Sequence, residues 1–199
     1  MSKMKNTYVY EIDGNLYVNI TNKFSNYCEF CVRNMKKEYE GYDLWLEKEP
    51  TAEEILAAVP KGKEYNSVVF CGYGEPTERF EVLKKTAAAL KGEYRLRLNT
   101  NGQGNLINGR DITDEIALLF DEVNVSLNAS TAEKYDDICH SVFGKQAFGA
   151  IIEFARSCAK KGVKTHFSVV DCIGEDEVEA CRVLAFQNRV LFRVRKFIV

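Results

Sequence analysis

The sequence predicts an α/β fold, a partial (β/α)6 TIM-like barrel with parallel strands. Short runs rich in β-branched or aromatic residues alternate with helical patterns along the whole chain, which is typical of βαβ units. The chain has 199 residues, fewer than the roughly 250 of a complete eight-unit barrel. An open doubly wound sheet is the alternative. With no internal repeat or domain boundary, residues 1–199 are expected to form a single domain.

Six strands and five helices are predicted. The strands are expected at 16–21, 67–71, 95–99, 122–127, 163–170 and 190–195. Thr51 and Glu54 form a capping box that opens a helix, which Pro60 and Gly62 terminate. The other helices are expected through Phe80, Leu83, Ala87 and Leu90 with a stop at Gly92, after a second capping box of Ser130 and Glu133, over 147–161 with Gly162 behind it, and over 175–187.

Four of the predicted strands alternate apolar with polar residues, whereas strands covered on both faces are nearly uniformly apolar. The apolar face must meet the helices, so the polar face points into the barrel, where it favours binding of a polar ligand. For any single strand, a solvent-facing surface is the alternative. The polar positions are Arg95, Arg97 and Asn99, then Asn124, Ser126 and Asn128, then His166 and Ser168, and finally Arg193 and Arg195.

Composition and charge argue against nucleic-acid-binding, membrane-spanning and disulfide-rich secreted proteins. The formal net charge of −2 gives no indication of a nucleic-acid or anionic-membrane partner. No apolar run approaches the roughly 18 residues of a membrane span, and the N-terminus lacks a secretory signal. A cytoplasmic protein is expected. Seven cysteines, an odd number, argue against a disulfide framework, and Cys158 and Cys181 fit buried helix positions.

Three predicted loops at the carboxyl ends of strands carry candidate chemistry. Cys28 and Cys31 form a CxxC pair, which alone fits zinc, an iron–sulfur cluster, a redox site or core packing. Glu75, within Gly72-Tyr73-Gly74-Glu75, suits either an amine ligand or a helix N-terminus. Asn99 and Thr100 suit ribose hydroxyls or an Asx-type turn.

These loops together resemble the radical SAM superfamily, whose members use S-adenosylmethionine (SAM). The resemblance rests on CxxC with Phe30 before its second cysteine and on Gly-Tyr-Gly-Glu-Pro after the second predicted strand. Cys-Gly-Tyr-Gly-Glu-Pro-Thr, Leu-Asn-Thr-Asn-Gly, Val-Ser-Leu-Asn-Ala and the terminal Phe-Arg-Val-Arg are similar to the branch of TatD-associated radical SAM proteins. The resemblance to the family extends from about Leu16 to the C-terminus.

The resemblance implies a metal-binding enzyme that cleaves SAM reductively to a 5′-deoxyadenosyl radical, which takes hydrogen from an unknown substrate. A reductant such as flavodoxin or ferredoxin would supply the electron. Cys28 and Cys31 would ligate a [4Fe–4S] cluster, and Phe30 would pack beside the adenine. The remaining SAM contacts would be Gly72, Tyr73, Gly74 and Glu75 at the methionine amine, Asn99 and Ser126 at the ribose or carboxylate, and 170–174 at the adenine.

One position departs from the superfamily motif Cys-x3-Cys-x2-Cys, because Phe24 stands where the first cysteine belongs. Cys71 is one possible substitute ligand. Alternatively the cluster is absent and the protein binds SAM or a nucleoside without it, or Phe24 is a recent change in an otherwise intact enzyme. His166 and the arginines Arg97, Arg193 and Arg195 are further candidates for substrate contact, although a satisfied interior histidine is the preferred explanation for His166 and a lumen ion-pair network explains the arginines equally well.

Overall fold

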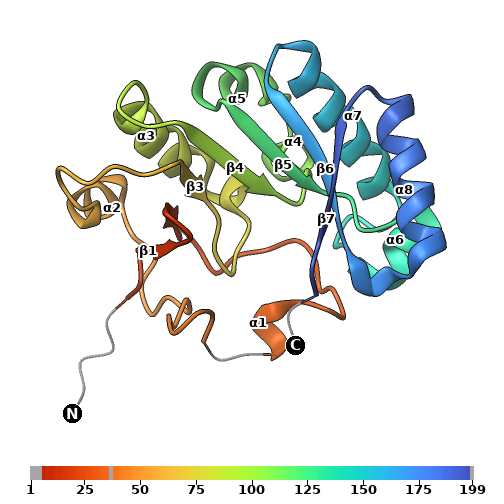
Figure 1. Ribbon diagram of the computed structural model, residues 1–199, viewed down its shortest axis with the longest axis horizontal. Helices are drawn as coiled ribbons and strands as arrows, with labels where there is room; N and C mark the ends of the chain where they lie inside the picture. Colours follow the sequence, from red (N-terminus) through yellow and green to blue (C-terminus); the bar gives the residue numbers. More distant parts are fainter. Residues whose placement is uncertain (1–5, 36–37, 198–199) are drawn as a thin grey trace.

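The computed structural model describes residues 6–35 and 38–197, which form one seven-stranded sheet covered by helices (Figure 1). The strands are β1 (Val9–Ile12), β2 (Asn15–Val18), β3 (Val68–Phe70), β4 (Leu96–Thr100), β5 (Glu122–Ser126), β6 (Lys164–Val170) and β7 (Leu191–Arg195). They lie side by side in chain order, and every pair from β2 to β7 is parallel. The predicted α/β class with parallel strands is confirmed, and β1 and β7 are the two edges of a sheet that does not close among the described strands.

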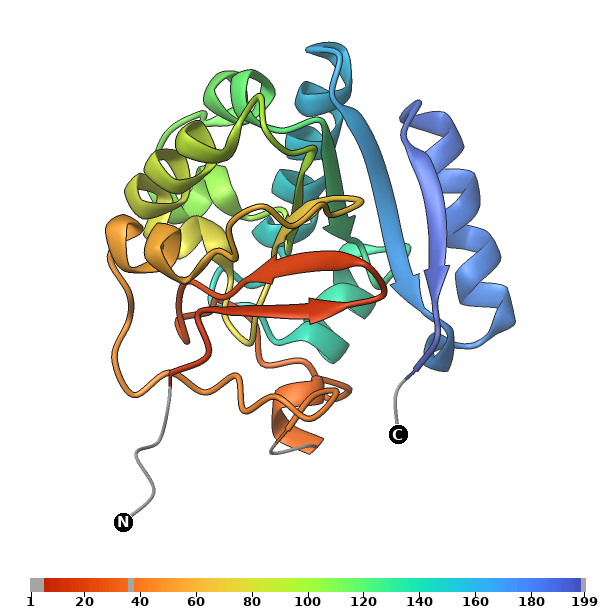
Figure 2. The same cartoon turned by 60° about the vertical axis from the view of Figure 1, so that its left-hand side comes forward.

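Helices follow the strands along the chain. They are α1 (Val32–Met35), α2 (Ala52–Ala58), α3 (Phe80–Leu90), α4 (Gly104–Asn108), α5 (Thr113–Leu119), α6 (Ala132–Cys139), α7 (Gln146–Lys160) and α8 (Glu175–Gln187), with 3-10 turns η1 (Pro76–Arg79) and η2 (Asp171–Ile173). Figures 1 and 2 show α3, α5, α7 and α8 ranged along the outer side of the sheet, and α1 near the end to which the β6 and β7 arrows point. No helix of the described residues is long and apolar enough to cross a membrane.

The main core lies between the sheet and the outer helices. Leu96, Leu98, Val123 and Val125 are fully buried there against Phe154 and other helix residues. Because side chains alternate along a strand, the intervening polar residues point to the opposite face, which we call the inner face. Burial of apolar surface between the sheet and the helices stabilises their packing by about 25 cal/mol for each Å². This packing occupies the outer face, so the inner face is left to ligands or solvent.

The capping box at Thr51 forms as predicted, with its hydroxyl accepting from the Glu54 amide and the Glu54 carboxylate accepting from the Thr51 amide. Four features of the sequence-based prediction are wrong. The first predicted strand ends at Val18, and β1 precedes it, paired with β2 as an antiparallel hairpin through Asp13 and Gly14. Thr131, not Ser130, caps α6, because its hydroxyl accepts from the Lys134 amide. Helices α4 and α5 were not predicted.

Candidate functional site

The inner face of the sheet carries several buried polar atoms that have no hydrogen-bond partner within the described residues. Three of the residues lie side by side on adjacent strands, since Asn99 pairs in register with Asn124 and Asn124 with His166. Leaving such groups unpaired costs about 1–3 kcal/mol each, so their clustering points to a polar ligand. The atoms are Oδ1 of Asn19, Asn99, Asn124 and Asn128, both ring nitrogens of His166, and Nε of Arg97 and Arg195.

His166 therefore differs from the expected satisfied interior histidine. Its Nε2 lies 3.7 Å from Oε1 of Glu122, too far for a hydrogen bond. Burial lowers the pKa of His166 even though the Glu122 charge opposes that effect. His140, by contrast, is an exposed residue at the end of α6.

Cys28 lies at the carboxyl end of the inner face, buried against the last turn of α6. The amide of Tyr27 donates to the Cys139 carbonyl (2.8 Å) and the amide of Glu29 to the Ile138 carbonyl (3.2 Å). These bonds bring the Cys28 and Cys139 thiols together in a hydrogen bond, which lowers the pKa of Cys28 and raises that of Cys139. Cys139 is the partner that the sequence did not reveal, because 111 residues separate the two positions.

Phe24 occupies the position of the missing cysteine, and its ring is covered. The Arg33 guanidinium carbon lies 4.0 Å from the ring centroid, and the Tyr27 ring meets it edge-on at 6.1 Å. Such cation–π contacts contribute about 0.5–2 kcal/mol. A cavity of about 370 Å³ opens beside them, lined by Asn22, Lys23, Phe24, Tyr27, Arg33 and Glu78.

Neither Cys31 nor Cys71 belongs, among the described residues, to a group of three side chains that could bind one metal ion. Cys31 is half-buried, packs on the main core, and its amide donates to the Cys28 carbonyl (3.2 Å). Cys71 is hydrogen-bonded by Asn99, and burial raises the pKa of its thiol. Within residues 6–35 and 38–197, no three Cys, His, Asp or Glu side chains are grouped so as to hold a metal ion.

Glu75 is buried and turned into the protein. Its Oε1 accepts hydrogen bonds from the Thr77 amide (3.1 Å) and from the hydroxyls of Thr77 (2.7 Å) and Thr100 (2.8 Å), and its Oε2 accepts from the Asn101 amide (2.7 Å). It caps η1 and joins the loops after β3 and β4. Burial nevertheless raises the pKa of this carboxyl. Of the two roles expected for Glu75, the one at a helix N-terminus agrees with where its oxygens lie. Contact of Glu75 with an amine ligand stays a prediction.

The glycines before Glu75 are required by the protein's own packing. A Cβ added at Gly72 would overlap the Asn19 side chain, and one added at Gly74 would overlap the carbonyl oxygens of Thr21 and Lys23. The amide of Glu75 also donates to the Lys23 carbonyl (2.8 Å). The segment is thus held tightly against the loop that carries Phe24 and the CxxC pair.

A buried polar network, not predicted from the sequence, links that loop to the loop after β4, to helix α6 and to the segment that follows α6. Gln103 donates through Nε2 to Oδ1 of Asn26 (2.7 Å) and to the Tyr135 hydroxyl (2.9 Å), while Ser141 donates to Oε1 of Gln103 (3.1 Å). Asn101 donates to the Ser25 hydroxyl (2.8 Å). Scattered Asn, Gln and Ser residues give no sequence signal for such a network.

The other predicted SAM contacts lie around the same rim. Ser126 accepts a hydrogen bond from Nη2 of Arg195 at 3.4 Å, and burial lowers the pKa of that arginine. Phe30 is half-buried against the main core, and Tyr73 packs in a second cluster with Tyr10 and Leu44. At the end of β6, Val170 is buried, and η2 and Gly174 (φ 89°) follow it. The contacts expected of these residues with SAM stay predictions.

Comparison with known proteins identifies the family. The profile of the Radical SAM superfamily matches residues 18–184, and no curated protein matches the chain. The structure resembles a radical SAM methyltransferase from Sphaerobacter thermophilus (18% identity, 94% of this chain and 57% of that one, TM-score 0.63). It also resembles SuiB of Streptococcus suis bound to S-adenosylmethionine (17%, 92% and 38%, 0.64) and the FeFe-hydrogenase maturase HydG from Carboxydothermus hydrogenoformans (14%, 94% and 44%, 0.65).

The fold and this match define a radical SAM-type α/β domain. The chain belongs to the Radical SAM superfamily. At these sequence identities the structural likeness shows the fold, and the chain spans between 38% and 57% of the lengths of the three solved structures. Radical SAM proteins are generally enzymes that use SAM and a [4Fe–4S] cluster.

The residues of this chain fit SAM, but they do not fit a [4Fe–4S] cluster held by three thiolates. The unpaired Asn, His and Arg atoms of the inner face offer donors and acceptors of the kind that a nucleoside and an amino acid require. For a cluster held by three thiolates, the arrangement does not fit. Phe24 is stacked under Arg33, and Cys28 is hydrogen-bonded to Cys139 inside the protein.

Proposed function

We propose that this protein binds SAM, or a closely related nucleoside, on the inner face of its sheet, and that it does so without a three-thiolate cluster. The observation that carries the proposal is the row of unpaired polar atoms on β4, β5 and β6, at Asn99, Asn124 and His166. A folded protein that buries such atoms without partners is destabilised, whereas a polar ligand would satisfy them.

Charge on the same face supports this class of ligand. Arg195 is half-buried and donates to Ser126, and a guanidinium there suits the carboxylate of the methionine moiety. The expected SAM contacts at Asn99 and Ser126 belong to neighbouring strands. Binding would thus draw on several strands of one rigid sheet, as is common where parallel strands end.

The test is calorimetry with SAM on metal-free wild-type protein, beside two variants. Asn124→Leu removes an unpaired buried oxygen, so the fold is retained while SAM binding weakens at least tenfold. The matched control is Asn66→Leu, at an exposed asparagine outside the inner face, which leaves binding unchanged. Folded wild-type protein that gives no saturable heat with SAM contradicts the proposal, and so does equal affinity in Asn124→Leu.

The second candidate is a radical SAM enzyme acting on an unknown substrate with a reductant such as flavodoxin or ferredoxin. The presence of Cys28 and Cys31 at the carboxyl end of the sheet favours it. Formation of 5′-deoxyadenosine by anaerobically reconstituted wild-type protein with a chemical reductant would support this candidate. If that product is absent both in wild type and in Phe24→Cys, the enzyme candidate fails for this chain, while SAM binding remains separately measurable. The single-domain organisation and the cytoplasmic location are likewise proposals.

A further inference from the structure

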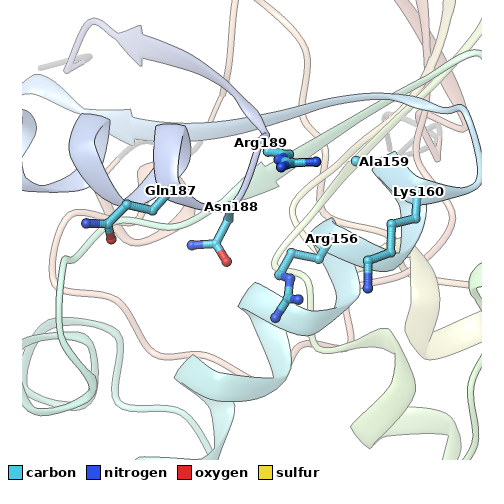
Figure 3. Close-up of a pocket in the computed structure, with 6 residues that line it drawn as sticks. All are labelled: Arg156, Ala159, Lys160, Gln187, Asn188 and Arg189. Carbon is cyan, nitrogen blue, oxygen red and sulfur yellow. The ribbon is translucent and has the colours of Figure 1, made fainter.

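A second cavity lies far along the strands from the inner-face rim, where α7 and α8 end and lead into β6 and β7 (Figure 3). Its volume is about 540 Å³, inside the range of about 300–1,000 Å³ that small-molecule sites occupy. The residues come from the last turns of α7 and from the segment after α8. They are Arg156, Ala159, Lys160, Gln187, Asn188 and Arg189.

The lining is cationic. Three of its residues are Arg or Lys and none is acidic. Glu153 is close to Arg156, with Oε2 at 3.3 Å from Nη1, whereas Lys160 and Arg189 have no ion-pair partner within the described residues. Each helix C-terminus contributes about half a negative charge. After these two ends and Glu153 are counted, about one positive charge remains for a ligand.

Arg189 is held in a backbone conformation that favours glycine. Its φ is 56°, and it follows α8 at the position where a left-handed residue closes the helix. The amide of Arg189 donates to the Phe186 carbonyl (3.0 Å) and that of Val190 to the Ala185 carbonyl (3.0 Å). Those bonds need the left-handed backbone but no side chain. Glycine would adopt this backbone with less strain, which is compatible with a use for the guanidinium, although His140 closes α6 in the same left-handed region.

Favourable contact of cations with helix C-termini is the simpler explanation, and it suffices for Lys160 in the last turn of α7. It does not account for Arg189, where glycine would close the helix with less strain. It also does not account for a cavity between the three cations. The carboxamide of Gln187 adds a neutral hydrogen-bonding group to the same lining, whereas Nδ2 of Asn188 donates to the Leu184 carbonyl (2.8 Å).

We propose that this cavity binds a phosphoryl group, either as free phosphate or on a small phosphorylated molecule. Two guanidinium groups present planar pairs of N–H donors that match phosphate oxygens, and the Lys160 ammonium adds a compact charge. A phosphoryl group carries a charge of about −1.5 to −2 at pH 7, so the positive charge that remains in the lining attracts it without neutralising it fully. The site does not share residues with the inner face, so it is independent of SAM binding.

The experiment is calorimetry of the full chain with inorganic phosphate and, separately, with glycerol phosphate, at low ionic strength. Wild type is expected to bind at least one of them saturably at one site. Preference for glycerol phosphate identifies a phosphorylated small molecule as the ligand, and equal or weaker binding of it identifies the free ion. The variants Lys160→Gln and Arg189→Gly are expected to weaken binding at least fivefold, and Lys85→Gln, at an exposed lysine of α3, leaves it unchanged.

Arg189→Gly separates binding from folding. It relieves the left-handed backbone, so its urea unfolding midpoint is expected to rise while phosphate binding falls. Absence of saturable binding of either probe to wild type overturns the proposal. So does unchanged affinity in both Lys160→Gln and Arg189→Gly.

Discussion

The guanidinium carbon of Arg33 lies 4.0 Å above the centroid of the Phe24 ring, so the side chain at the position of the missing cysteine is covered by a cation from α1. A phenylalanine ring, covered or not, has no lone pair to offer a metal ion. Four residues later, Cys28 turns into the protein and shares a hydrogen bond with Cys139. Because Phe24 stands at the first position of the motif, the CxxC loop, although held firmly at the rim, offers two thiolates and not three.

Gly74 tests how firmly that loop is held. Gly74→Ala would drive a Cβ into the carbonyl oxygens of Thr21 and Lys23, and because backbone must shift, we expect a loss of about 2–4 kcal/mol in the free energy of unfolding. Urea unfolding followed by circular dichroism measures it. The control is Gly149→Ala, within α7 and with nothing near its added Cβ, which should stabilise by about 1 kcal/mol. Equal effects of the two substitutions would show that the close approach at Gly74 is not required.

Glu75 is expected to matter for stability before any ligand binds. Glu75→Gln replaces one acceptor oxygen by an amide that cannot accept, so at least one of its four hydrogen bonds is lost. We expect a decrease of about 1–3 kcal/mol in the free energy of unfolding of ligand-free protein. Glu78→Gln, at the half-buried neighbour on η1, is the comparison. A Glu75→Gln protein as stable as wild type would mean that this carboxylate is not an internal anchor.

His166 gives the fold a dependence on pH with a defined sign. Burial lowers its pKa below 6.5 in the folded state, so the unfolded chain binds a proton at a higher pH than the folded chain does. Its contribution to stability is therefore intact above the unfolded pKa and is lost as the pH falls below about 6.5 toward the folded pKa. Urea unfolding of wild type at pH 7.5 and 5.5 should show this loss, and His166→Gln should show less of it. A variant with the full wild-type loss would contradict the assignment, and His140→Gln controls for removal of a histidine.

Much of the fold was predictable because its signals are local. The capping box of Thr51, the helix Glu175–Gln187 and the alternation on β4 are all confirmed. The hairpin of β1 also has a local signal, the Asp13-Gly14 turn between apolar runs, but the strand before this turn has only four residues and gives a weak pattern. At α6 the shift of the cap from Ser130 to Thr131 reflects two adjacent hydroxyls that sequence alone does not distinguish.

The candidate site was predictable only in outline. The polar strand faces and the rim loops follow from alternation and topology, and the structure bears out that Arg97, Asn99, Asn124 and His166 share one face. The inward turn of Glu75, the Cys28–Cys139 contact and the Arg33 cover on Phe24 depend on tertiary packing between segments remote in sequence. Spacing within a motif does not determine such contacts.

The central claim, that Phe24 removes the three-thiolate site, is tested by the iron and sulfide content of protein purified and reconstituted without oxygen. Phe24→Cys restores the Cys-x3-Cys-x2-Cys spacing and is expected to bind about four irons per chain, whereas wild type should bind markedly fewer. Phe24→Ala, which removes the ring under Arg33 without adding a thiol, should resemble wild type. Wild-type protein that holds as much iron and sulfide as Phe24→Cys would contradict the account.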